Sequence, residues 1–180
     1  MGLFKKAPSP YQTALAMVGA RPGDRVLVAG RPEPAVVAQL ALITGLSGQT
    51  LLAIDTASKS PYDAAAAEAG ALLEHADSGS APASLPDTGG NHDAVVLHFD
   101  LATLDDSTRE ALAARAMALA RPGGRVVIIE GRRQGGWFSS KTPTVAADVP
   151  LGLLQRAGGH AVRHLGTVDG ISYFEARKTR

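Results

Sequence analysis

Residues 25–55, RVLVAGRPEPAVVAQLALITGLSGQTLLAID, decide the fold of this chain. The stretch opens with an apolar segment, 26–29, whose unbroken hydrophobicity is typical of a parallel strand buried on both faces. A turn at Gly30 leads into a predicted helix over 35–46, and a second apolar segment ends at Asp55. This order predicts a βαβ unit in which the turn opens onto the positively polarised end of the helix.

The predicted helix carries apolar residues at helical spacing. Val36, Leu40 and Ile43 lie on one face, and Val37 and Leu42 widen the stripe. A stripe of this width is expected to face the sheet.

Composition restricts the class of protein. At 180 residues the chain is long enough for one domain with a substantial core, and its 45% hydrophobic and 19% charged residues are typical of a globular protein. A net charge of +1 gives no reason to expect a nucleic-acid partner. The absence of cysteine excludes disulfides and thiolate metal sites and fits a cytoplasmic protein. We expect no metal site, because the five histidines lack ligand spacing, and no membrane span, because no apolar run is long enough.

Strands and helices alternate to the end of the chain. The pattern predicts helices at 11–18, 61–69, 107–120 and 150–157, strands at 71–75, 93–99, 125–130, 161–165 and 171–176, and a Ser/Gly/Pro/Ala-rich loop at 77–91. Ser107 and Glu110 have capping-box spacing at the start of the third of these helices. The sum predicts a single-domain, three-layer α/β sandwich with a mostly parallel, doubly wound, Rossmann-like sheet that ends in an antiparallel strand pair.

Four sequence motifs resemble those of the class I S-adenosylmethionine-dependent methyltransferases. Residues 121–125, RPGGR, are similar to the family's turn before strand five, and 93–96, DAVV, to its fourth strand. Ala76-Asp77 resembles the pair of residues after strand three, and 157–176 resembles the closing helix end and strands. The resemblance implies a methyltransferase-like domain at 20–178, preceded by an N-terminal segment with a short helix at 1–19.

The resemblance also implies S-adenosylmethionine as cofactor and assigns residues to it. Asp55 would hold the ribose hydroxyls, Asp77 would accept from the adenine amino group, and Gly30 would let the backbone approach the methionine part. His98 and Phe99 would line the pocket near the transferred methyl group. The complete implied cofactor-binding set is Ala29, Gly30, Asp55, Thr56, Asp77, His98 and Phe99. No catalytic residue is assigned, because methyl transfer from a sulfonium can proceed by positioning and desolvation.

The glycine-rich turn departs from the family pattern. Pro32 and Pro34 occupy the positions of two turn glycines, and Val28 stands where the first strand usually has an acid. Proline supplies no N–H donor, and the carboxylate of Glu33 would repel the methionine carboxylate. A second hypothesis therefore stands beside the enzyme: a non-catalytic relative that acts in protein interaction.

Structural alternatives accompany several of these residues. Asp55 has the position of a helix cap, and His98 that of a hydrogen-bonded structural histidine. Trp137 and Phe138 would either cover the site as a flap or plug the sheet edge, and an enzyme's substrate would enter over 132–144. That substrate would be a small molecule or a protein side chain; the sequence specifies neither its identity nor the oligomeric state.

Overall fold

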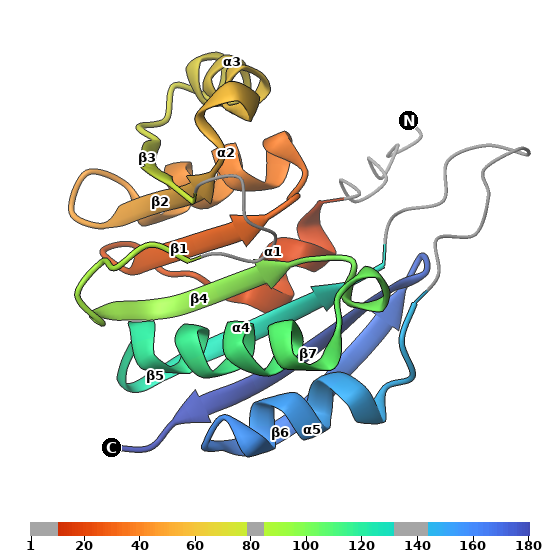
Figure 1. Ribbon diagram of the computed structural model, residues 1–180. Helices are drawn as coiled ribbons and strands as arrows, with labels where there is room; N and C mark the ends of the chain where they lie inside the picture. Colours follow the sequence, from red (N-terminus) through yellow and green to blue (C-terminus); the bar gives the residue numbers. More distant parts are fainter. Residues whose placement is uncertain (1–10, 79–84, 132–143) are drawn as a thin grey trace, which may run out of the picture.

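The predicted α/β architecture is confirmed by a computed structural model, which describes residues 11–78, 85–131 and 144–180 (Figure 1). One seven-stranded sheet has the order β3-β2-β1-β4-β5-β7-β6. The strands are β1 (Arg25–Gly30), β2 (Gln49–Ile54), β3 (Glu74–Asp77), β4 (His92–His98), β5 (Ala120–Glu130), β6 (Gly159–Val168) and β7 (Ile171–Lys178). The first five strands are parallel, and β7 runs antiparallel to both β5 and β6.

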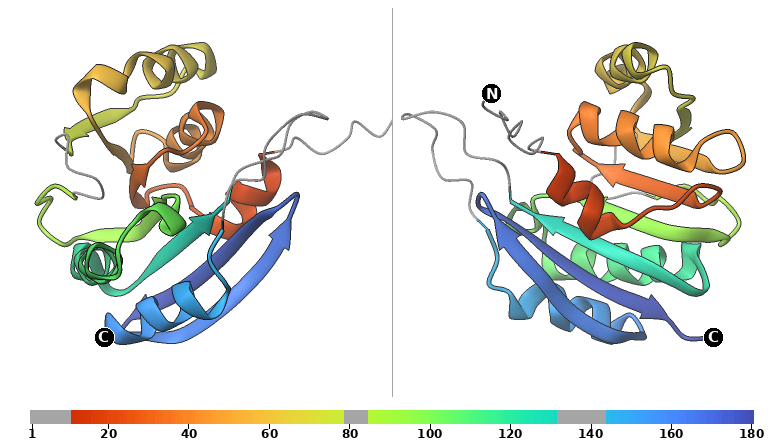
Figure 2. Two further views of the ribbon diagram at one scale, coloured as in Figure 1. Left: turned by 45° about the vertical axis from the view of Figure 1, so that its right-hand side comes forward. Right: turned by 180° about the vertical axis from the view of Figure 1, so that it is seen from behind.

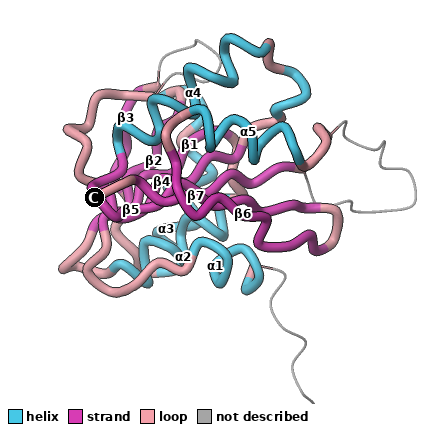
Figure 3. Tube along the Cα trace, turned by 90° about the horizontal axis from the view of Figure 1, so that it is seen from below, coloured by secondary structure: helices cyan, strands magenta, loops and turns pink. Residues whose placement is uncertain are grey.

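Helices cover both faces of this sheet and give three layers (Figures 2 and 3). The elements are α1 (Gln12–Val18), α2 (Pro34–Thr44), α3 (Ser60–Ala69), α4 (Asp106–Leu119) and α5 (Asp148–Arg156), with short 3-10 turns η1 (Thr56–Ser58) and η2 (Leu101–Thr103). Helices α1, α2 and α3 lie on one face, and α4 and α5 lie on the other.

The central strand β1 is apolar throughout because it contributes to both cores. Val26 and Val28 lie in the cluster on the α1–α3 face, whereas Leu27 and Ala29 lie in the cluster on the α4–α5 face. All four are at most 1% exposed. Fully burying each valine or leucine side chain stabilises the fold by about 1.5–3 kcal/mol.

The predicted apolar stripe of α2 is correct for Val36, Val37 and Leu40, which are buried, but wrong for Leu42, which is 50% exposed. Two residues along a helix correspond to a rotation of about 200°, so Leu42 faces away from the sheet when Leu40 faces it. The helix also ends at Thr44, two residues before the predicted end.

Strand β3 lies further along the chain than the predicted 71–75. Leu72 is 72% exposed, and the strand pairs with β2 from Leu51 opposite Glu74 to Ile54 opposite Asp77. Pairing with β2 therefore sets its position, whereas the sequence prediction followed local hydrophobicity. As a result Asp77, expected in a loop, is the last residue of the strand.

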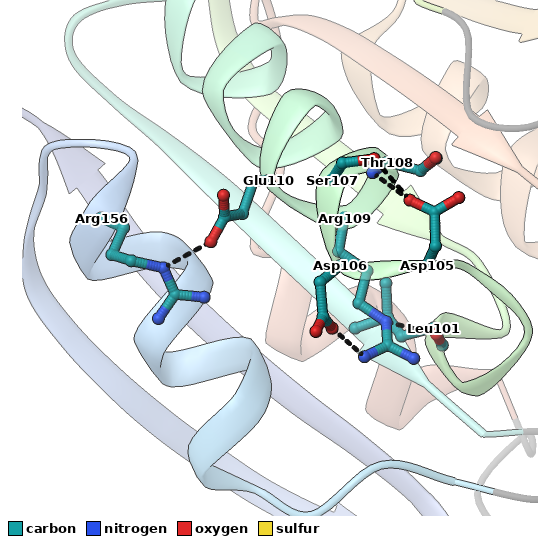
Figure 4. Close-up of polar contacts among 8 residues, drawn as sticks. All are labelled: Leu101, Asp105, Asp106, Ser107, Thr108, Arg109, Glu110 and Arg156. Carbon is teal, nitrogen blue, oxygen red and sulfur yellow. Dashed lines mark hydrogen bonds and ion pairs between the residues drawn. The ribbon is translucent and has the colours of Figure 1, made fainter.

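The predicted capping box at the start of α4 is wrong (Figure 4). The N-cap is Asp105, whose Oδ1 accepts the Ser107 hydroxyl and the Thr108 N–H, both at 2.7 Å. These two bonds lower the pKa of Asp105 to about 2. Glu110 instead accepts from Arg156 Nε of α5 at 3.0 Å. A carboxylate three residues ahead of Thr108 thus replaces the weaker hydroxyl cap that Ser107 would have supplied.

Strands β5 and β6 also differ from expectation. β5 begins at Ala120, so the RPGGR motif lies inside the strand, where its pairing with β4 shifts register between His92 and Ala94. β6 forms one edge of the sheet, and its pairing with β7 shifts twice, between His160 and Arg163 and between His164 and Gly166. Trp137, Phe138 and most of the 132–144 segment lie outside the described residues, as does part of the 77–91 loop.

Candidate functional site

The parallel strands bring four of the predicted site residues to one edge of the sheet. Gly30 pairs with His98 across β1 and β4, and Ile54, which precedes Asp55, pairs with Asp77 across β2 and β3. These are the carboxyl ends of the strands, the ends with arrowheads in Figure 1. The chain passes from β1 to β2 on one side and later to β4 on the other, so β1 and β4 flank the topological switch point where open α/β sheets bind ligands.

Gly30 is required by the close approach of β1 to the end of β4. Its φ is +99°, and a Cβ there would overlap the carbonyl oxygen of His98 and come within 3.1 Å of the Phe99 ring. The next residue, Arg31, donates its N–H to the same carbonyl at 2.7 Å. The glycine therefore has a structural role here, in addition to the predicted contact with a cofactor.

The proline-containing turn after Gly30 is fixed to the neighbouring helix α3. Pro32 is buried, and its carbonyl oxygen accepts a hydrogen bond from the Tyr62 hydroxyl at 2.9 Å. Pro34 is the first residue of α2, where the lack of an N–H costs nothing. Glu33 is exposed and, among the described residues, its side chain makes no cap bond to the α2 amides. Its carboxylate therefore does not cap the N-terminus of that helix.

Asp55 caps the short η1 turn, as the structural alternative anticipated. Its Oδ1 accepts the Ala57 N–H at 3.0 Å, and the residue is exposed at the end of β2 beside Thr56. An ionised carboxylate has two oxygens and about four lone-pair sites. One cap bond therefore leaves Asp55 able to accept hydroxyl groups from a ligand.

Three other predicted residues differ in what they can offer a ligand. His98 Nε2 lies 3.1 Å from the carbonyl oxygen of Gly131, which assigns the proton to Nε2 and ties the end of β4 to the end of β5. Phe99 is half-buried against the α4–α5 core. Ala29 has a side chain within that core, so only its backbone can meet a ligand.

Glu130 is a residue of this edge that the sequence analysis missed. It ends β5, is 2% exposed, and accepts the N–H of Leu101 at 3.2 Å and that of Val145 at 3.4 Å. Burial raises the pKa of its carboxyl group. The side chain thus joins the segment after β4 to the segment before α5. The available signal was a single acid at the carboxyl end of an otherwise apolar strand.

In the described ranges no three His, Asp or Glu residues are grouped so that they could hold a metal ion. Within the same residues no helix has the length and hydrophobicity needed to cross a bilayer.

Comparison with known proteins identifies the fold. No protein-family model matches the chain, and no curated protein matches it by sequence. Solved structures match over almost its whole length. The apo S-adenosylmethionine-dependent methyltransferase SibL is 16% identical with a TM-score of 0.72, covering 95% of this chain and 55% of its own. A methyltransferase of the same cofactor class from Aquifex aeolicus is 19% identical with a TM-score of 0.68, covering 93% and 89%.

A putative O-methyltransferase from Nostoc punctiforme is 14% identical with a TM-score of 0.74, covering 94% of this chain and 56% of its own. The chain therefore spans little more than half the length of SibL and of the Nostoc protein. At these identities the likeness concerns the fold. The chain has the fold of the class I S-adenosylmethionine-dependent methyltransferases, as its sequence motifs indicated.

Proposed function

We propose that the protein is an S-adenosylmethionine-dependent methyltransferase that binds its cofactor at the carboxyl edge of the sheet, beside β1 and β4. The observation that supports this most directly is the convergence of Gly30, Asp55, Asp77 and His98 on that edge, in a fold shared with methyltransferases.

The donor set at this edge fits an adenosyl ligand. The exposed carboxylate of Asp55, with Thr56 beside it, would accept the ribose hydroxyls, and Asp77 would accept the adenine amino group. The backbone of Ala29 and Gly30 would face the methionine part. When bound, the cofactor supplies a methyl group on a positively charged sulfur. The chain's contribution would be to orient cofactor and substrate and to exclude water, with Phe99 and the bonded His98 as walls.

The two prolines are compatible with this proposal. They remove N–H donors from the turn, but the bond between Tyr62 and Pro32 holds the turn in one conformation before any ligand arrives. A turn that is already ordered loses little conformational entropy on binding, which offsets the lost donors. Glu33 is exposed, and in the described part of the chain its carboxylate makes no cap bond to the α2 amides.

Replacing Asp55 with asparagine tests the assignment without removing the cap. The asparagine amide oxygen can still accept the Ala57 N–H, but the charge and the second acceptor oxygen are lost. We expect an unchanged melting temperature without ligand and an affinity for S-adenosylhomocysteine reduced about tenfold or more, measured by calorimetry. Asp87→Asn is the matched control, because that exposed aspartate precedes β4 at the other end of the sheet.

Thermal melts give the overall test. At a ligand concentration about one hundred times the dissociation constant, binding adds about 2.7 kcal/mol, which raises the midpoint of a domain of this size by roughly 5–11 °C. No shift with millimolar S-adenosylmethionine or S-adenosylhomocysteine would refute the enzyme and favour the non-catalytic hypothesis. A shift that Asp55→Asn leaves intact would refute only the role of Asp55.

A further inference from the structure

Basic side chains gather at the opposite end of the sheet, where β5 begins and β7 ends. Arg125 of β5 pairs with Arg177 of β7, and Arg177 pairs with His160 of β6. Residues directly opposite on neighbouring strands point to the same face of a sheet, so these three side chains form one row. The C-terminus lies at this same end in Figure 1, away from the arrowheads of the parallel strands.

The charges in this region are unbalanced. Glu175, with a side chain 3% exposed, lies between three arginines: 3.7 Å from Arg125 Nη1, 3.5 Å from Arg163 Nη2 and 3.7 Å from Arg177 Nε. Three guanidinium groups facing one carboxylate leave an excess of two positive charges. Structural neutralisation of Glu175 requires only one of them.

Arg125 is the member of this cluster that has an unsatisfied hydrogen-bond donor within the described part of the chain. Its Nη2 is buried and has no hydrogen-bond partner among the described residues. Burial lowers the pKa of Arg125, and repulsion from Arg177 and Arg21 acts in the same direction, against the attraction of Glu175 and Asp24. Nη2 of Arg125 is enclosed against Gly19, so an additional anion would meet this cluster at the partly exposed Arg177.

A hollow beside the cluster provides room for that anion. Its volume is about 390 Å³, and its lining residues are Gly123, His160, Arg177, Thr179 and Arg180. Three of the four side chains that line it are basic and none is acidic. Arg177 belongs to both the cluster and the hollow, and its Nη1 donates to the Gly123 carbonyl at 3.4 Å, which orients the guanidinium.

We propose that this hollow binds the phosphate group of a ligand. A tetrahedral, multiply charged anion matches the planar, fork-like donors of Arg177 and Arg180 better than a single point charge would. The His160 ring and the Thr179 hydroxyl add further hydrogen-bond donors. The site lies at the amino edge of the parallel strands and is therefore separate from the adenosyl site proposed at the carboxyl edge.

Titration with pyrophosphate at low ionic strength, followed by calorimetry and by NMR of the arginine side chains, tests the proposal. We expect Arg177→Gln to weaken binding about tenfold or more, as loss of a charge-assisted donor pair predicts. Arg180→Gln should weaken binding similarly while leaving the melting temperature unchanged, because Arg180 forms no ion pair with Glu175 among the described contacts. The matched control is Arg156→Gln, which removes the same charge from an exposed pair with Glu110 on the other face.

The same titration with a short single-stranded oligonucleotide identifies the source of the phosphate group. If it binds no more tightly than pyrophosphate, the ligand is a small phosphate compound. If it binds more tightly and depends equally on Arg177, the phosphate belongs to a nucleic-acid strand. The proposal is overturned if neither ligand binds at millimolar concentration in low salt, or if both bind Arg177→Gln as well as wild type. Binding of S-adenosylhomocysteine should be the same in every variant, so this site and the adenosyl site are judged separately.

Discussion

Replacing Gly30 with alanine is expected to cost more stability than any exposed substitution, because two separate penalties coincide there. A non-glycine residue held at φ +99° stores about 1–3 kcal/mol of backbone strain. The new methyl group would also overlap the His98 carbonyl, and forced overpacking costs about 1–3 kcal/mol. Separating the strands would in addition weaken the 2.7 Å bond from the Arg31 N–H, worth about 1 kcal/mol. The sum is about 3–7 kcal/mol, a large part of the roughly 5–15 kcal/mol that stabilises a domain.

Gly70→Ala separates the steric penalty from the backbone penalty. Gly70 ends α3 at φ +68°, and no described atom lies within 4 Å of its added Cβ. The expected loss there is about 1–2 kcal/mol, from left-handed strain alone. Urea unfolding followed by far-UV circular dichroism gives both free energies on one scale. If Gly30→Ala lost no more than Gly70→Ala, the close contact between β1 and His98 would not be the reason for the glycine.

Two buried titratable groups at opposite ends of β4 and β5 make opposite predictions about pH. Burial lowers the pKa of His92 from its ordinary 6.5, so the unfolded chain binds this proton at a higher pH than the folded chain does. The free energy of unfolding should therefore fall as the pH drops below 6.5. Urea unfolding at several pH values should show this slope, and His92→Gln should flatten it. Burial raises the pKa of Glu130 above its ordinary 4.5, so the contribution of its protonated carboxyl group to stability is full below pH 4.5 and declines as the pH rises. The loss of melting temperature caused by Glu130→Gln should therefore be smaller at about pH 8 than at about pH 5. An equal loss at both pH values would contradict this account.

The sequence could predict those parts of the fold that local hydrophobicity and turn residues specify. The order from β1 through Gly30 and α2 to Asp55 follows from the apolar segments and the glycine, and the structure confirms it. The position of β3 could not be predicted in this way, because it depends on pairing with β2 and leaves Leu72 exposed. The α4 cap was mispredicted because Asp105 and Ser107 both precede the helix and a carboxylate is the stronger acceptor.

The candidate site was predicted unevenly. Strand pairing brings the ends of the strands that carry or precede Gly30, Asp55, Asp77 and His98 to one edge of the sheet, and the ligand contacts of these residues stay predictions. Glu130 was missed because its role depends on backbone amides that meet only in the folded chain. A residue whose partners are main-chain groups of distant segments leaves no spacing pattern in the sequence.

The two register shifts in β6 have a consequence for the outer border of the sheet. A strand that ends a sheet presents unpaired amide and carbonyl groups, which another polypeptide can use to extend it. In β6 the pairing with β7 is interrupted near Ala161, which has φ +51°, and again before Gly166. The charged side chain of Arg163, which is largely exposed, lies between these two interruptions. An incoming chain would find no long, straight row of acceptors and donors. These irregularities therefore protect the protein from growing into larger β-assemblies through this border.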